Sequence, residues 1–105
     1  MSISPQRVRE LVAQLPDAQE GMHHGHPDFR VKKKIFATLS EREDRAALRI
    51  TSLEARALAD RDPDVFRLVS DRAPIGWVSV LLARATDPEF SDLLEEAYRL
   101  RTGDR

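Results

Sequence analysis

The sequence predicts a two-layer α+β domain in which three helices cover one face of an antiparallel sheet. Strand-like segments follow one another in runs and do not alternate strictly with helices, which favours an antiparallel sheet over a parallel one. Helical patterns with start signals occur near each end of the chain and once in between. The length of 105 residues is ordinary for one domain, so we expect a single domain over residues 1–105.

The first helix is predicted to begin after Ser4. A serine is a good N-cap, and Pro5 suits the first helical position, where its missing N–H costs nothing. The apolar side chains that follow recur at helical spacing: Val8, Leu11, Val12 and Leu15. Pro16 stops this run, so the segment reads as one amphipathic helix.

Four strands are predicted in the next third of the chain. A short edge strand is expected around residues 20–23, and residues 29–31 and 34–40 form the arms of a hairpin. Lys32 and Lys33 are unusual in its turn, because neither residue favours the positive φ that a two-residue hairpin turn requires. After a charged connector, residues 46–50 alternate cleanly and predict another strand.

The middle helix is predicted from a capping box, with Thr51 as the cap and Glu54 three residues later. Its apolar residues are the following: Leu53, Ala57 and Leu58. We expect Asp62 and Pro63 to restart a turn of helix that brings Val65 and Phe66 inward.

One or two strands and a last helix complete the prediction. Residues 76–82 alternate, with Val78, Val80 and Leu82 on one face and Trp77 on the other. Thr86 and Glu89 form a second capping box. The helix that follows presents one apolar side and ends before Gly103: Phe90, Leu93, Leu94, Ala97, Tyr98 and Arg101.

Composition excludes several classes of site. The chain has no cysteine, so disulfides, iron–sulfur clusters, thiolate zinc sites and cysteine nucleophiles are absent. No apolar run is long enough to span a membrane, and the first residues lack the features of a signal peptide. We therefore expect a cytoplasmic protein that does not enter membranes and is a monomer or a small homo-oligomer.

Charge is distributed unevenly along the chain. The net charge is −1, which argues against an obligate nucleic-acid coat protein. Residues 1–40 carry six Lys and Arg against four Asp and Glu, whereas residues 41–105 carry eleven against fourteen. All the lysines lie together in the predicted hairpin turn: Lys32, Lys33 and Lys34. With Arg30 they form a cationic tip that could contact phosphates without reading the base sequence. Alternatively, the charges serve only to keep the protein soluble and to prevent sheet edges of different molecules from pairing.

Two further groups of residues are candidate binding sites. His23, His24 and His26, with Asp28 behind them, are possible ligands for zinc or nickel. Neighbouring side chains of an extended segment point to opposite faces, so we expect surface histidines and no metal. Trp77, the sole tryptophan, is either a stacking surface for a base or a partner chain, or a core or rim residue. Arg72, in the loop at residues 70–75, would add a second cation near it.

No catalytic arrangement is visible. The serines lack a nucleophile-elbow context, and the four glycines are scattered, so there is no glycine-rich phosphate loop. We expect no enzyme activity and no cofactor.

The chain resembles the MmcQ/YjbR family over about residues 5–101. The resemblance is carried by several segments in order: Leu15-Pro16-Asp17-Ala18-Gln19-Glu20-Gly21, Phe29-Arg30-Val31, Lys34-Ile35-Phe36-Ala37, Asp62-Pro63, Phe66, Gly76-Trp77, Val80 and Leu93-Leu94-Glu95-Glu96-Ala97-Tyr98. It implies an α-β(3–4)-α-β(2)-α fold similar to type III secretion chaperones and to the frataxin-like fold. The family is commonly labelled DNA-binding because its two hairpins resemble a double wing, although a fold does not fix a function.

On this resemblance, residues 30–34 are the first wing and residues 71–77 the second. Many members carry an Asn-Lys pair and a histidine before the tryptophan, whereas this chain has Arg72, Ala73 and Pro74 there. Many also have a glycine in the first turn, where this chain has Lys33. The first wing is therefore more basic than is usual in the family, and the second less so.

The sequence thus supports two functional hypotheses. The first is weak, sequence-independent DNA binding through Arg30 and the three lysines, helped by Arg72 and Trp77. The alternative is a protein-interaction or chaperone-like adaptor that uses an exposed, apolar sheet face around Trp77 and Leu81 and performs no catalysis.

Overall fold

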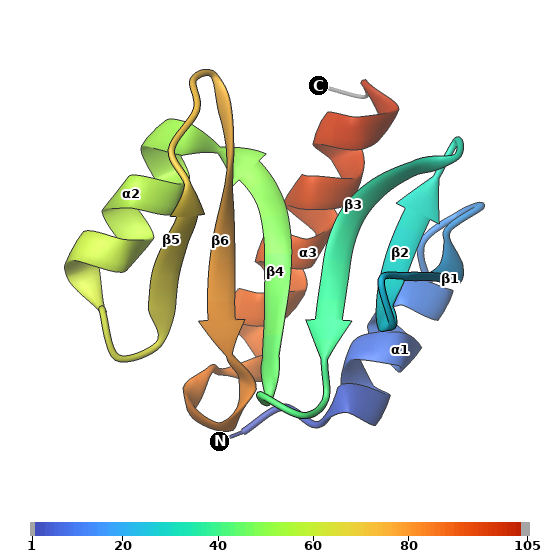
Figure 1. Cartoon of the computed structure of the whole chain (residues 1–105), viewed down its shortest axis with the longest axis horizontal. Helices are drawn as coiled ribbons and strands as arrows, with labels where there is room; N and C mark the ends of the chain where they lie inside the picture. The colour runs from blue at the N-terminus through green and yellow to red at the C-terminus, as the bar shows by residue number, and fades with distance from the viewer. Residues whose placement is uncertain (1, 104–105) are drawn as a thin grey trace.

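One antiparallel sheet of six strands, with three α-helices packed against it, organises the chain (Figure 1). The structure is a computed structural model that describes residues 2–103, the side chain of His23 excepted. The elements, in chain order, are α1 (Pro5–Ala13), β1 (Gln19–His23), β2 (His26–Val31), β3 (Lys34–Ser40), β4 (Arg45–Thr51), α2 (Ser52–Arg61), β5 (Phe66–Ser70), β6 (Ile75–Leu81), the 3-10 helix η1 (Leu82–Arg84) and α3 (Asp87–Thr102). The strand order across the sheet is β1-β2-β3-β4-β6-β5, so the predicted α+β class is confirmed.

Local signals place the helix starts correctly. The Ser4 hydroxyl accepts a hydrogen bond from the Arg7 amide at 3.0 Å, and the Thr51 hydroxyl accepts one from the Glu54 amide at 3.2 Å. The Thr86 hydroxyl accepts one from the Glu89 amide at 3.4 Å. Each cap satisfies an amide that has no partner within its own helix, which is why these short sequence patterns locate helix ends.

The core lies between the sheet and the helices. α3 packs on β2, β3 and β4, and α2 packs on β4, β5 and β6. Alternate residues of the central strands point toward the helices and are fully or almost fully buried: Leu48 and Ile50 of β4, and Val78 and Val80 of β6. The intervening residues point to the opposite side, which no helix covers and which faces the viewer in Figure 1. We call this side the open face.

The prediction for residues 62–66 is confirmed, whereas the prediction for the buried face of the middle helix is partly wrong. The amides of Val65 and Phe66 donate to the Asp62 carbonyl at 3.1 and 2.9 Å, which makes one turn that brings both side chains inward. Residues 66–70 then form the edge strand β5, a segment to which the sequence analysis assigned no strand. In α2 the buried face consists of Ala55 and Leu58, and Leu53 is 81% exposed. No strand was assigned to residues 66–70 because five residues directly after a turn give too short a pattern to recognise.

The two hairpin turns predicted as wings lie at the same end of the molecule. The β2–β3 turn and the β5–β6 loop both project at the top of Figure 1, and the C-terminal turn of α3 lies between them. We call this the wing end. The β3–β4 turn and η1 lie at the opposite end. None of the helices in residues 2–103 is long and apolar enough to cross a membrane.

Candidate nucleic-acid interface

The β2–β3 turn is a two-residue turn made of lysines. Val31 pairs with Lys34, and Lys32 and Lys33 between them have φ values of 53° and 66°. These are the left-handed values that a type I′ turn requires and that favour glycine or asparagine. The chain therefore keeps two exposed ammonium groups at the tip despite the backbone cost.

Arg30 is held in place by a buried carboxylate. Asp28 is 0% exposed and accepts hydrogen bonds from Arg30 Nε at 2.8 Å and Nη2 at 2.9 Å. This hydrogen bonding raises the pKa of Arg30 above its ordinary value. A Cβ atom on Gly21 of β1 would lie 2.9 Å from Asp28 Oδ1, so a glycine at this position makes room for the pair.

The ion pair fixes Arg30 and does not remove it from the surface. Its side chain stays 38% exposed, and two of its five N–H donors are used on Asp28. Arg30, Lys32 and Lys33 together line a hollow of about 410 Å³ at the wing end, completed by Asp17 and Gln19. Three of the predicted residues therefore converge on one concave surface.

The three lysines have no carboxylate partner in the part of the chain that the structure describes. Lys32 Nζ donates to the Thr102 carbonyl at the end of α3, at 3.4 Å, so its contact within residues 2–103 is with a neutral acceptor. Lys34 is exposed on β3 and does not line the hollow. Within the described residues, no carboxylate neutralises the charge of the turn.

The second wing contributes less. Arg72 is exposed, whereas the neighbouring Asp71 pairs with Arg56 of α2 at 3.0 Å. The Pro74 carbonyl accepts from the Ser52 amide at 2.9 Å and ties the loop to the start of α2. Neither Arg72 nor Trp77 lines the wing-end hollow. The two wings share one end of the molecule without forming one cluster.

Trp77 lies on the open face of β6 and is half-buried there. It pairs with Arg49 of β4 on one side and with Ser70 of β5 on the other. Trp77 is therefore neither a core residue nor part of the wing tip. It belongs to a separate surface.

The histidine motif forms the β1–β2 turn. His24 and Gly25 take positive φ values between the paired residues His23 and His26. His24 and His26 border a hollow of about 310 Å³ on the open face, and the side chain of His23 lies outside the described residues. Among the described side chains, which do not include that of His23, no group of three or more His, Cys, Asp or Glu residues is arranged to hold a metal.

Three arginines of the open face were not predicted as site residues. Arg45 and Arg49 alternate with buried residues along β4, and Arg67 lies on β5 opposite Ser79. The alternation of residues 46–50 already placed Arg49 on the side away from the core. Arg67 was missed because β5 was not recognised as a strand.

Comparison with known proteins identifies the family but no activity. The YjbR family model matches residues 13–100. The crystal structure of Deinococcus radiodurans protein DR2400, which has a DUF419 domain, superposes with a TM-score of 0.83 at 20% identity, over 94% of this chain and 78% of the other. A Pseudomonas syringae protein superposes with a TM-score of 0.71 at 14% identity, over 94% of this chain and 99% of the other.

At these identities the structural likenesses show the fold alone, and no protein of curated function matches the sequence. The family match covers most of the chain and agrees with the order of strands and helices. The chain therefore belongs to the YjbR family.

Proposed function

We propose that the protein binds DNA weakly and without sequence preference, through phosphate contacts at the β2–β3 turn. The observation that supports this most directly is the wing-end hollow, where Arg30, Lys32 and Lys33 converge. Phosphate contacts of this kind supply affinity and orientation but read no bases.

The chemistry of the hollow suits a phosphate oxygen. Arg30 is pre-oriented by Asp28, so little side-chain entropy is lost when its remaining donors bind an anion. The lysines act as flexible point charges beside it. Asp17 and Asp28 offset part of this charge, which is consistent with weak binding. Arg72 is a further cation at the same end.

The adaptor hypothesis required an apolar sheet face around Trp77 and Leu81. On the open face Arg49 lies opposite Trp77 and Arg45 lies opposite Leu81. A face with this charge is a poor match for an apolar partner, so we do not propose the adaptor role as a second function.

The test compares Lys32→Ala/Lys33→Ala with a charge-matched control, Arg42→Ala/Arg84→Ala. The control arginines are exposed and lie in the β3–β4 turn and η1, at the end opposite the wings (Figure 1). Binding to a generic duplex is measured by anisotropy at several salt concentrations. Loss of two phosphate contacts should make the salt slope shallower by about 1.8, and should cost about tenfold in affinity at the lowest salt.

The control should keep the wild-type affinity and slope to within about twofold, because its charges lie far from the proposed contact. Equal losses in the two double variants would show that binding follows net charge alone. Unchanged binding in the lysine variant would overturn the proposal.

A further inference from the structure

The open face carries positive charge around an aromatic ring, away from the wing tip. Arg49 lies directly across from Trp77 in the β4–β6 ladder. Ser79, two residues along the same face of β6, lies across from Arg67 of β5. Trp77 therefore has one arginine directly opposite and another on the diagonal, both within the reach of cross-strand neighbours.

We propose that this open face is a second, separate binding surface, which takes single-stranded nucleic acid with Trp77 stacking on a base and Arg49, Arg67 and Arg45 contacting phosphates. Stacking platforms beside cationic side chains are the usual means by which proteins hold unpaired strands.

The arginines of the open face lack carboxylate partners in the described part of the chain. Arg45 Nε donates to the Ser79 hydroxyl at 2.7 Å, and Nη2 donates to the Ser79 carbonyl at 3.2 Å. Neither Arg49 nor Arg67 forms an ion pair. Asp28 is engaged by Arg30, and Glu43 has only a small electrostatic effect on Arg45.

Electrostatics within the face are unfavourable without a bound anion. Burial lowers the pKa of Arg45, and the neighbouring Arg67 lowers it further, against a smaller opposing effect of Glu43. Burial also lowers the pKa of Arg49, and Arg101 from the end of α3 adds to this effect. A polyanion lying across the open face would relieve the repulsion between Arg45 and Arg67.

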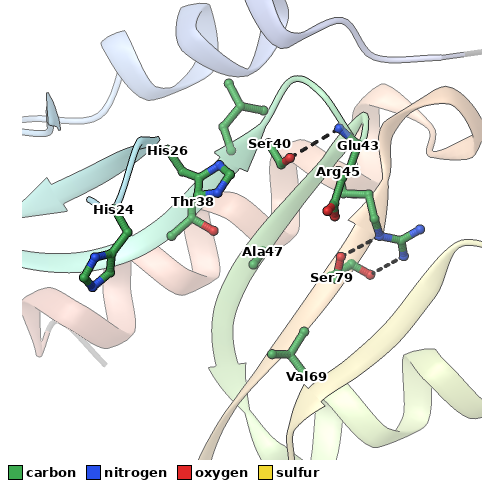
Figure 2. A pocket seen from close by; sticks show the side chains of 10 residues that line it. His24, His26, Thr38, Ser40, Glu43, Arg45, Ala47, Val69 and Ser79 are labelled. Carbon is green, nitrogen blue, oxygen red and sulfur yellow. Dashed lines mark hydrogen bonds between the residues drawn. The ribbon is translucent and has the colours of Figure 1, made fainter. Parts of the chain in front are cut away.

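A hollow beside these arginines has the character of a base site. Its volume is about 310 Å³, at the lower end of small-ligand sites, which run from roughly 300 to 1,000 Å³. Figure 2 shows Ala47 and Thr38 between the histidines of the β1–β2 turn and Val69 of β5. Apolar groups for the flat faces of a base thus alternate with hydroxyl and imidazole groups for its polar edge.

These features favour an unpaired strand over other polyanions. A duplex keeps its bases stacked, so the flat base faces that Trp77 and the hollow would hold are hidden. An acidic peptide would pair with the arginines, but its carboxylate side chains offer no planar ring to stack on Trp77 or to fill the hollow. Single strands supply both phosphates and exposed base faces.

Trp77 is the only tryptophan, so its fluorescence reports directly on this face. We expect a twelve-residue oligothymidylate to quench it, with a salt slope of about −2 for three phosphate contacts on a single strand. Arg49→Gln/Arg67→Gln should weaken binding about tenfold and make the slope shallower by about 1.4. The charge-matched control Arg84→Gln/Arg99→Gln changes η1 and an exposed position on α3, and should leave the slope unchanged.

The absence of quenching at low salt would overturn the inference. An equal effect of the two glutamine variants would also overturn it. Polyglutamate is titrated in parallel: quenching of the same strength and with the same arginine dependence would assign the face to acidic peptides instead.

The variant Lys32→Ala/Lys33→Ala separates the two surfaces, because it should lose duplex binding and keep quenching by the oligonucleotide. If it abolishes quenching, the wing function stands and the open-face site does not.

Discussion

Lys32 and Lys33 each place a positive charge in the β2–β3 turn at a cost in backbone conformational energy. Both have positive φ in a turn where asparagine and glycine cost least. A non-glycine residue in the left-handed region costs about 1–2 kcal/mol. The hairpin tolerates this because β2 and β3 are anchored by buried residues such as Phe29 and Phe36. The lysines are thus supported by the sheet and do not themselves stabilise the turn.

Replacing Lys33 by glycine should therefore stabilise the protein. We expect Lys33→Gly to raise the free energy of unfolding by about 1 kcal/mol, since glycine adopts positive φ without steric cost. The matched control is Lys34→Gly, which removes the same charge from a β3 position of ordinary extended conformation. It should lower stability by about 1 kcal/mol. Urea denaturation measures both, and a Lys33→Gly variant less stable than wild type would contradict this account.

The individual site residues were only partly predictable. The lysine cluster is visible in the sequence because it is local. Asp28 and Arg30 are two residues apart on one strand, so their side chains share a face, and this spacing could have suggested the ion pair. The need for glycine at position 21 could not be seen, because it arises from the pairing of Gly21 with Asp28 across two strands.

At the scale of elements, the helix caps were predictable, whereas the residues that form the short edge strand were not. Helix starts depend on contacts three residues apart, as for Thr51 and Glu54. β5 depends on its ladder with β6, and its register shifts between Leu68 and Ser70, which breaks the simple alternation. This error concealed Arg67, and with it the charge of the open face.

The docking of α1 on the start of α3 gives a prediction about pH. Arg7 Nε donates to Asp87 Oδ2 at 2.8 Å, and this hydrogen bond lowers the pKa of Asp87 below its ordinary value of 3.8. A carboxyl with a lowered pKa in the folded state contributes stability above its unfolded pKa, and the contribution is lost as the pH falls through the folded pKa. Asp87→Asn should therefore be less stable than wild type at neutral pH. This gap, the difference in free energy of unfolding between the two proteins, should close as the pH falls below 3.8.

Urea denaturation of both proteins across this pH range measures the gap directly. Asp92→Asn on the same helix is the control, because Asp92 is exposed and forms no ion pair in the described structure. It should show a small gap that does not depend on pH. If the Asp87→Asn gap is the same at neutral and at acid pH, the Arg7–Asp87 pair does not hold α1 in place.

For the whole molecule, the decisive property is which arginines are paired. Five of the six α-helical arginines contact carboxylates within residues 2–103: Arg7, Arg9, Arg56, Arg61 and Arg99. Of the four arginines on strands, only Arg30 does so. A net charge of −1 therefore coexists with a sheet whose open face is positive. Composition cannot show this segregation, because it arises only when the chain folds and the helical arginines form ion pairs with carboxylates.

The architecture also predicts how stability is distributed. β4 lies between β3 and β6 and is covered by α2 and α3, whereas β1 pairs only with β2 at the edge of the sheet. Met22 of β1 is 64% exposed, so little apolar area is lost when this strand opens. We expect β4 and β6 amides to exchange only through global unfolding, and hydrogen-bonded β1 amides to exchange at least about tenfold faster.

Amide hydrogen exchange followed by NMR tests this prediction, with measurements at two pH values to establish that exchange reports on opening equilibria. The result bears on the open face, because the β1–β2 turn supplies His24 and His26 at the margin of its hollow. Fast local opening of β1 would let this margin move while the arginines of β4 and Trp77 of β6 stay fixed. Protection of β1 equal to that of β4 would instead make the whole sheet one cooperative unit, with a hollow of fixed shape.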